Sequence, residues 1–187
     1  MATILAGIDE AGMGTLAGPL VAAVVVIEAS RVPMGVRDSK KLSNDQREEL
    51  AALIMAEAEF YNVVAVGPAV VDRAGLSPGW LRAVREVALQ AHRMYDGEII
   101  LDGNRLVDLS YVRPVVKADD KYPAVSAASI LAKYTQCCWM DDYHLKFPAY
   151  GFDQHHGYGT VNHMKVLKEV GPCPAHRKSF GPVKKLL

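Results

Sequence analysis

Two adjacent carboxylates stand between two apolar runs near the start of the chain. Asp9 and Glu10 follow the apolar run 3–6 and precede a longer one at 20–27. Burying a charged carboxylate costs several kcal/mol unless another group compensates its charge. A divalent cation supplies that compensation, because hard cations bind carboxylate oxygens. The pair therefore indicates a cation site rather than a part of the core.

Two further acids follow predicted strands later in the chain. Asp102 follows a short strand predicted at 98–101, and Asp119 follows another predicted at 111–116. Strand ends of an α/β sheet converge at the edge where such folds place their sites. Taken singly, each acid is more simply explained as a solvated strand-end residue. Four carboxylates without Cys or His at ligand spacing nevertheless favour Mg²⁺ or Mn²⁺ over zinc.

The glycines beside the first pair have two interpretations. Neighbouring strand residues point to opposite faces, so Asp9 and Glu10 reach one cation only if the strand turns there. Gly12 and Gly14 permit such a turn. The segment 12–17 also matches the dinucleotide-binding pattern G-x-G-x-x-A, but a Gly-Pro pair and a β-branched run follow it instead of the required helix. We therefore reject a dinucleotide site.

The elements that must position the acids form an α/β pattern. Helices are predicted from a capping box at Ser43 and Gln46 to about residue 58, and at 80–95, 123–145 and 160–170. Segment 68–79 is predicted to be a short, turn-rich connection. Strands are predicted at 3–9, 20–27, 60–66, 98–101 and 111–116. This order predicts an α/β fold with a mixed central β-sheet flanked by helices.

Length and composition indicate one globular domain. The chain has 187 residues, of which 50% are hydrophobic. No apolar run approaches the roughly 20 residues of a membrane span, and the first residues lack the features of a signal peptide. The 3 cysteines form neither a disulfide framework nor a zinc motif, so a cytoplasmic protein is expected. The net charge is zero, but 10 Lys and Arg against 6 Asp and Glu from Lys117 onward permit phosphate contacts.

Six motifs occur in a fixed order along nearly the whole chain. They are DEAGMG at 9–14 with AGP at 17–19, DSKKLS at 38–43, LDG at 101–103, KAD at 117–119 with SAASILAK at 126–133, YGF at 150–152 with GYGT at 157–160, and HRKSF at 176–180. In content and order they resemble ribonuclease HII, the type 2 ribonuclease H family. Chance agreement of six ordered motifs is not credible.

The resemblance implies an RNase H-like fold in a single catalytic domain, 1–187, with a small helical, substrate-binding C-terminal extension at about 146–187. It implies a monomeric endonuclease that cuts the RNA strand of RNA–DNA hybrids and the 5′ side of single ribonucleotides embedded in duplex DNA. It also implies two Mg²⁺ or Mn²⁺ ions, products with 3′-hydroxyl and 5′-phosphate ends, and roles in RNA primer removal and ribonucleotide excision repair.

The resemblance assigns the acids by position. The catalytic and metal-binding quartet falls on Asp9, Glu10, Asp102 and Asp119. Asp119 is preferred over its neighbour Asp120 because it lies ten residues before the second serine of SAASILAK, as the motif spacing requires. Asp120 is then a solvated neighbour.

The resemblance also assigns substrate contacts. The 2′-hydroxyl-sensing loop falls on Gly12, Met13 and Gly14, and the junction-sensing tyrosine on Tyr158. Simple turn packing is the alternative for Tyr158. The candidate phosphate contacts are basic residues, with solvated side chains as their alternative: Lys40, Lys41 and Lys133. His176 and Arg177 either bind phosphate or pin the tail to the core. His155, His156 and His163 are expected to be surface histidines, and Cys137 and Cys138 packed thiols.

Several positions depart from the family pattern and indicate a divergent member. Met13 replaces an arginine and Thr15 a proline, while His156 replaces a lysine. Gln136 and Cys137 replace an Arg-Asp pair, and segment 72–79 lacks the usual Asn-Ile. Met13 and Gln136 motivate one alternative function, a catalytically silent RNA–DNA hybrid-binding protein. The intact quartet favours the enzyme.

Overall fold

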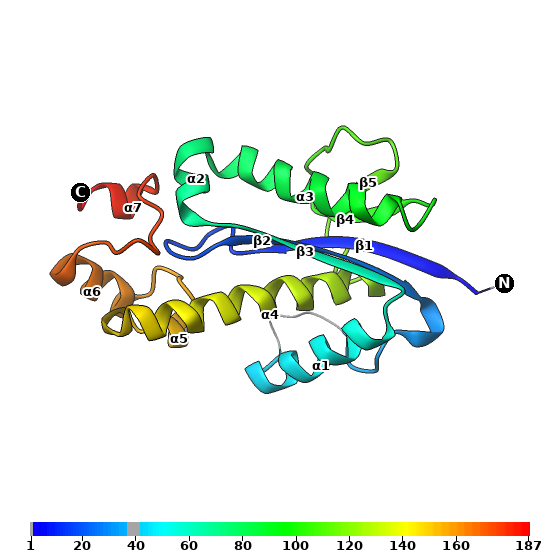
Figure 1. Cartoon of the computed structure of the whole chain (residues 1–187), viewed down its shortest axis with the longest axis horizontal. Coiled ribbons are helices and arrows are strands. Elements are labelled where there is room, and N and C mark those ends of the chain that lie inside the picture. Colours follow the sequence, from blue (N-terminus) through cyan, green and yellow to red (C-terminus); the bar gives the residue numbers. More distant parts are fainter. Residues whose placement is uncertain (1, 37–41) are drawn as a thin grey trace.

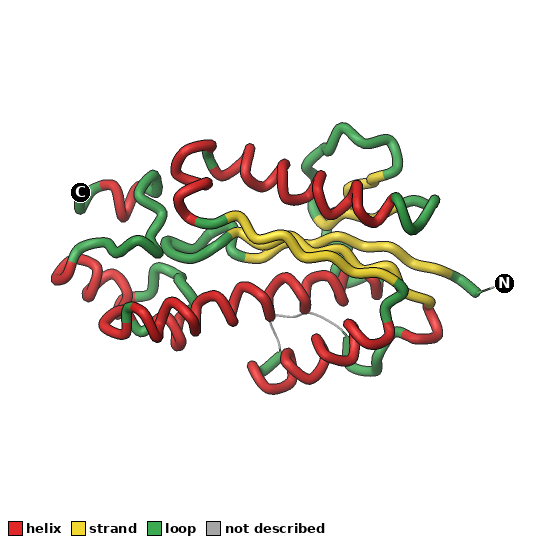
Figure 2. The backbone as a smooth tube through the Cα atoms, in the orientation of Figure 1, coloured by secondary structure: helices red, strands yellow, loops and turns green. Residues whose placement is uncertain are grey.

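A five-stranded mixed sheet forms the centre of the computed structural model, which describes residues 2–36 and 42–187. The strands are β1 (Ile4–Ala11), β2 (Leu20–Glu28), β3 (Phe60–Val66), β4 (Ile99–Asp102) and β5 (Val112–Val115). Their order is β3-β2-β1-β4-β5. Figure 2 shows the sheet nearly edge-on, with helices on either side of it. β1 pairs with β2, and β2 with β3, in the antiparallel sense, whereas β1–β4 and β4–β5 are parallel. The mixed sheet expected from the sequence is therefore confirmed.

Helices cover both faces of the sheet (Figure 1). α2 (Pro68–Ala74) and α3 (Leu76–His92) lie on one face, and α1 (Asn44–Glu57) and α4 (Pro123–Lys146) lie on the other. Alternate residues of β1 and β2 point to the two faces, so each face has its own core. Ile8 and Val24 pack with α3, whereas Val25 and Ile27 pack with α1 and α4. β2 is buried on both faces, as its nearly continuous apolar sequence predicts.

A close contact between β1 and α4 fixes the height of that helix over the sheet. A Cβ atom on Gly7 would lie 2.4 Å from the backbone nitrogen of Val125, so only glycine fits there. The facing turns of α4 carry small buried residues, Ala124, Ala127 and Ala128. The small residues predicted to allow close packing therefore do so, and they bring Ser129 over the end of β1.

The C-terminal part of the chain has a core of its own at one end of the molecule (Figure 1). It comprises η3 (Pro148–Tyr150), α5 (Phe152–His155), α6 (Val161–Val170) and α7 (Gly181–Lys184). Phe152 and Leu167 are fully buried there against Leu16, Ala17 and Met140. The segment is thus attached to the end of α4 and to the loop between β1 and β2.

Two main differences from the sequence expectations concern segment 68–79 and the end of β1. Segment 68–79 is not a turn-rich connection: it forms α2 and the first turn of α3, interrupted only at Gly75, where φ is +91°. Pro78 fits the first turn of α3 because the amide that proline lacks has no partner in that turn. β1 continues to Ala11 rather than ending at Asp9.

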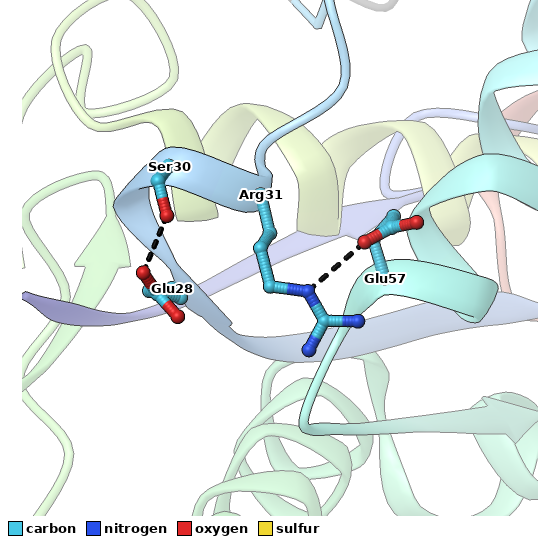
Figure 3. A network of polar contacts seen from close by, with 4 residues as sticks. All are labelled: Glu28, Ser30, Arg31 and Glu57. Atoms are coloured by element: carbon cyan, nitrogen blue, oxygen red, sulfur yellow. Dashed lines mark hydrogen bonds and ion pairs between the residues drawn. The ribbon is translucent and has the colours of Figure 1, made fainter. Parts of the chain in front are cut away.

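Two local features anchor α1. Ser43 and Gln46 form the predicted capping box, in which the Ser43 hydroxyl accepts from the Gln46 amide at 3.2 Å. At the other end, Arg31 in η1 (Ala29–Arg31) donates to Glu57 at 3.0 Å, and Ser30 donates to Glu28 (Figure 3). Both side chains of the Arg31–Glu57 pair are more than two-fifths exposed, so the pair adds little stability.

Candidate active site

The parallel pairing of β1 and β4 places two of the predicted acids side by side. Gly7 pairs with Ile100 and Ile8 with Leu101, so Asp9 and Asp102 follow at the next position of each strand. Strand alternation directs both side chains to the face covered by α4, because Ile100 packs there against Val125. Two carboxylates from residues 93 positions apart thus meet at one edge of the sheet.

Asp9 is buried among groups that oppose its negative charge. It is 7% exposed, and the pKa of its carboxyl is raised to about 8, chiefly by burial. The charges of Glu10 and Asp102 contribute to this rise, while hydrogen bonds from the Ser129 hydroxyl and the Glu10 amide (2.7 Å to Oδ1) act against it. Among the described residues, no lysine or arginine is a main cause of this shift. A cation bound here would offset both the burial and the like charges.

The side chain of Glu10 projects from the face of β1 opposite to that of Asp9. The strand does not turn after Asp9, since Glu10 pairs with Ala22 and Ala11 with Val21 in unbroken register. The predicted turn that would bring Asp9 and Glu10 to the same face is therefore wrong. The two carboxylates still interact, because the charge of Glu10 raises the pKa of Asp9. Asp9 and Asp102 therefore share one face of the sheet at this strand end, and Glu10 adds its charge from the next position of β1.

Asp119 approaches this edge from the loop between β5 and α4. Its neighbour Ala118 donates its amide to Asp102 Oδ1 at 2.7 Å, and its own carbonyl accepts a hydrogen bond from Ser126. Asp119 is half-buried and Asp120 beside it is exposed, and both line a cavity of about 660 Å³ between the starts of α1 and α4. Asp9, Glu10 and Asp102 do not line that cavity.

Asp119 is tied to the other acids through its neighbour, because the Ala118 amide bonds the Asp102 carboxylate. Within residues 2–36 and 42–187, no group of three or more His, Cys, Asp or Glu side chains is arranged to hold a metal ion. The structure thus sets Asp9 level with Asp102, leaves Glu10 at the next position of β1, and joins the loop of Asp119 to Asp102 through the Ala118 amide.

The loop after β1 contains the predicted 2′-hydroxyl-sensing residues. Gly12 adopts a φ of +82° and is buried, whereas Gly14 is exposed and its φ is not positive. Met13 is half-buried and packs against the α3-side core, so the side chain that replaces the family's arginine points inward. Thr15 closes the turn, since its hydroxyl donates to the Gly12 carbonyl at 3.2 Å.

Tyr158 and Lys133, both predicted to contact substrate, lie together at the surface. Tyr158 is 46% exposed, which favours a contact role over turn packing. The Lys133 ammonium lies 5.2 Å from the centre of its ring, and burial lowers the pKa of this lysine. Buried Gln136 accepts from Lys133 Nζ at 2.8 Å and donates to the His156 carbonyl at 2.9 Å. The residue that departs from the family pattern thus joins α4 to the Tyr158 loop.

His176 and Arg177 do not reach the surface, because they are 1% and 0% exposed. Of the two predicted alternatives, burial favours pinning the tail over binding phosphate. The Arg177 guanidinium donates to the carbonyls of Gly18 (3.0 Å) and Met13 (3.4 Å), and burial lowers its pKa to about 10. Lys40 and Lys41 lie outside the described residues.

Two other expectations are corrected by burial. His155 and His163 are 8% and 0% exposed, so they are core residues rather than surface histidines. Cys137 is buried as expected, but Cys138 on the same helix is exposed.

The roles of two residues at the site were not predicted from the sequence. Ser129 bonds Asp9, and Gln136 holds the Tyr158 loop. Ser129 lies inside the SAASILAK motif, which was the available signal. Gln136 stood out only as a departure from the family pattern.

Comparison with known proteins gives a consistent result over the whole chain. A family model described as Ribonuclease HII matches residues 6–183. A ribonuclease HII of Polaromonas sp. is 41% identical over 185 residues, covering 98% of this chain and 92% of that protein. A ribonuclease HII of Halorhodospira halophila is 44% identical over 184 residues, covering 97% and 93%.

Solved structures agree with the sequence relatives. Ribonuclease H2 of Pyrococcus horikoshii superposes with a TM-score of 0.81 at 28% identity, covering 98% of this chain and 97% of that one. RNase HII of Archaeoglobus fulgidus, solved in complex with PCNA, gives a TM-score of 0.80 at 31% identity, covering 94% of each chain. Among the helices of the described part of this chain, none has the length and apolar character to cross a bilayer. With acids at the ends of two adjacent parallel strands and relatives matched along nearly its full length, the chain belongs to the ribonuclease HII family of ribonuclease H enzymes.

Proposed function

We propose that this protein is an endonuclease that cleaves the RNA strand of RNA–DNA hybrids and cuts duplex DNA on the 5′ side of a single embedded ribonucleotide. The observation that carries the proposal is the meeting of Asp9 and Asp102 at one strand end, with Glu10 next to Asp9, in a chain of this family. RNA primer removal and ribonucleotide excision repair are the proposed biological tasks, carried out by a cytoplasmic monomer.

Asp9, Glu10, Asp102 and Asp119 are the residues proposed to hold two divalent cations, Mg²⁺ or Mn²⁺. All four supply the hard oxygen ligands that these ions prefer. Buried Asp9, opposed by two like charges, supports the fit. Two such ions, when bound, activate a water and stabilise the charge of the scissile phosphate, which leaves 3′-hydroxyl and 5′-phosphate ends.

The residues of the chain orient these ligands before any ion binds. The Ser129 hydroxyl holds the Asp9 carboxylate, and the Ala118 amide holds Oδ1 of Asp102 at 2.7 Å. Fixed carboxylates lose less conformational freedom when a cation binds, so this arrangement supports preorganisation of the site.

Substrate recognition is proposed for the two loops beside the acids. The exposed backbone at Gly14 permits close approach of a ribose, and a 2′-hydroxyl is the group that distinguishes RNA from DNA there. The half-exposed ring of Tyr158 offers a stacking surface, with Lys133 beside it as a phosphate contact. The C-terminal segment 146–187 and residues Lys40 and Lys41 are proposed to contact the duplex.

The proposal is tested with a DNA duplex bearing one ribonucleotide, incubated with the protein and Mg²⁺. A nick on the 5′ side of the ribonucleotide is expected. Binding of a hybrid without cleavage at any protein concentration would instead support the silent hybrid-binding alternative.

The matched pair Asp119→Asn and Asp120→Asn tests the quartet. Loss of cleavage is expected for Asp119→Asn, and near wild-type cleavage for Asp120→Asn, whose side chain is solvent-exposed. Equal loss in the two variants would contradict the assignment of the fourth acid.

A further inference from the structure

Three buried histidines lie beneath the Tyr158 loop and form a cluster that the catalytic proposal does not use. His155 and His163 stack with ring centroids 4.2 Å apart, and His163 lies 5.2 Å from His176. All three are less than a tenth exposed. They come from α5, α6 and the tail, so the cluster joins three separate segments.

The hydrogen-bond partners of the cluster determine which nitrogen of each ring carries a proton. His163 Nδ1 lies 2.8 Å from the Tyr158 carbonyl oxygen, which can only accept, so Nδ1 donates. In a neutral ring, Nε2 of His163 is then an acceptor, and it faces His176 Nε2 at 3.0 Å. His176 Nε2 must therefore donate, which leaves its Nδ1 as the acceptor for the Cys173 amide at 3.1 Å.

His155 obeys the same logic independently. Its Nε2 lies 2.8 Å from the Tyr150 carbonyl and so donates, and its Nδ1 accepts from the Gly157 amide at 3.2 Å. Every polar contact of the three rings is satisfied when all three are neutral. Adding a proton to any ring would set two donors against each other.

The chain of bonds ends on the backbone that carries Tyr158. The Tyr158 carbonyl accepts from His163 and from the Thr160 amide (2.9 Å), while the Tyr158 amide donates to the His155 carbonyl at 2.9 Å. The ring of Tyr158 is nearly half exposed and has only the nearby Lys133 ammonium as a described ring contact. The position of the ring is therefore set by these backbone bonds together with the neighbouring charges of Lys133 and Arg177.

We propose that His163 is a positioning residue for Tyr158, held in a single tautomer by His176, so that the tyrosine meets the substrate duplex in a fixed place. This inference rests on the proposed function, because it takes Tyr158 as a substrate contact. His163 itself touches neither substrate nor metal.

The surroundings of the cluster favour the neutral form of the three imidazole rings. The rings are packed against Phe152 from α5 and Tyr150 from η3, and Cys173 from the tail lies 3.2 Å from His176 Nδ1. Burial and the neighbouring histidines lower the pKa of His176 to about 4, and burial lowers that of His163. No carboxylate is among the groups that shift either value.

The first test uses the unmodified protein and does not depend on activity. Nitrogen-15 NMR of the imidazoles at pH 7.5 is expected to give the Nδ1–H tautomer for His163 and the Nε2–H tautomer for His155 and His176. An Nε2–H tautomer at His163 would overturn the proposal.

The second test compares His163→Asn with His163→Gln. An asparagine amide can occupy the place of Nδ1 and still donate to the Tyr158 carbonyl, whereas a glutamine amide reaches the place of Nε2. We expect the KM for a ribonucleotide-bearing duplex to rise about five-fold in His163→Gln, the size of one hydrogen bond, with kcat unchanged. We expect His163→Asn to restore most of the loss. Faster hydrogen exchange at the amides of Gly157 and Tyr158 is expected in the glutamine variant alone.

A Tyr158→Ala background separates positioning from general stability. There, His163→Gln is expected to have no further effect on KM, because the side chain it positions is gone. An equal rise in both backgrounds would overturn the proposal. If the wild-type protein cleaves no substrate, the proposed function fails, while the tautomer and exchange measurements still decide whether His163 positions the loop.

Discussion

The loop after β1 offers a matched pair of glycines for testing how backbone geometry supports the site. Gly12 has a φ of +82°, and a Cβ atom there would lie 2.4 Å from the Pro19 carbonyl oxygen. Gly14, two residues later, has no such φ, and a Cβ atom there would meet no heavy atom within 4 Å. Gly12→Ala and Gly14→Ala therefore make the same chemical change in one loop under opposite constraints.

The expected cost of Gly12→Ala follows from these numbers. A positive φ costs an alanine about 1–2 kcal/mol, and the shift that relieves the clash costs about 1–3 kcal/mol. The smaller entropy of the unfolded alanine chain returns about 0.4–1 kcal/mol. The net loss of unfolding free energy is about 2–4 kcal/mol, which lowers Tm by roughly 5–15 °C in a chain of this size.

Gly14→Ala is expected to leave the free energy of unfolding within about 0.5 kcal/mol of wild type. Urea denaturation and thermal melts measure both variants, and a nicking assay on the folded variants measures KM. If the ribose approaches the loop at Gly14, the added methyl group raises KM without lowering Tm. A Gly12→Ala protein as stable as wild type, or equal destabilisation by both changes, would refute this account of the loop.

Three further predictions concern the tail and the acids. The folded-state pKa of His176 is about 4 against 6.5 unfolded, so only the unfolded chain takes up its proton between these values, and stability should fall by up to about 3 kcal/mol as pH drops from 6.5 to 4. Urea titrations should show this slope reduced in His176→Gln. Asp72 accepts hydrogen bonds from Lys178 N, Ser179 N and Ser179 Oγ at 2.7–2.9 Å, so Asp72→Ala should lose about 1–3 kcal/mol and exposed Asp96→Ala almost none, measured by the same titrations. Mg²⁺ should raise the Tm of wild type, and a chelator should reverse the shift, whereas Asp9→Asn should respond little to either.

The sequence by itself determined the elements, and it singled out the acids that we propose as metal ligands. Strand and helix periodicity, the Ser43 capping box and the run of small residues in α4 are local signals, and each gave the observed element. Its one misjudged connection, 68–79, looked like a loop because Gly75 and Pro78 are loop residues in isolation. In the fold, Gly75 separates α2 from α3, and Pro78 occupies the first turn of α3.

Only the tertiary structure decided which residues meet and which are buried. The pairing register between β1 and β4 sets Asp9 beside Asp102. This register depends on contacts between strands about 90 residues apart in the chain. His163, His176 and Arg177 are buried because the tail packs against α6 and against the loop between β1 and β2. No local sequence pattern encodes that packing. Polar residues are interpreted as surface groups in a sequence, and they become core residues only where the fold supplies partners for most of their hydrogen bonds.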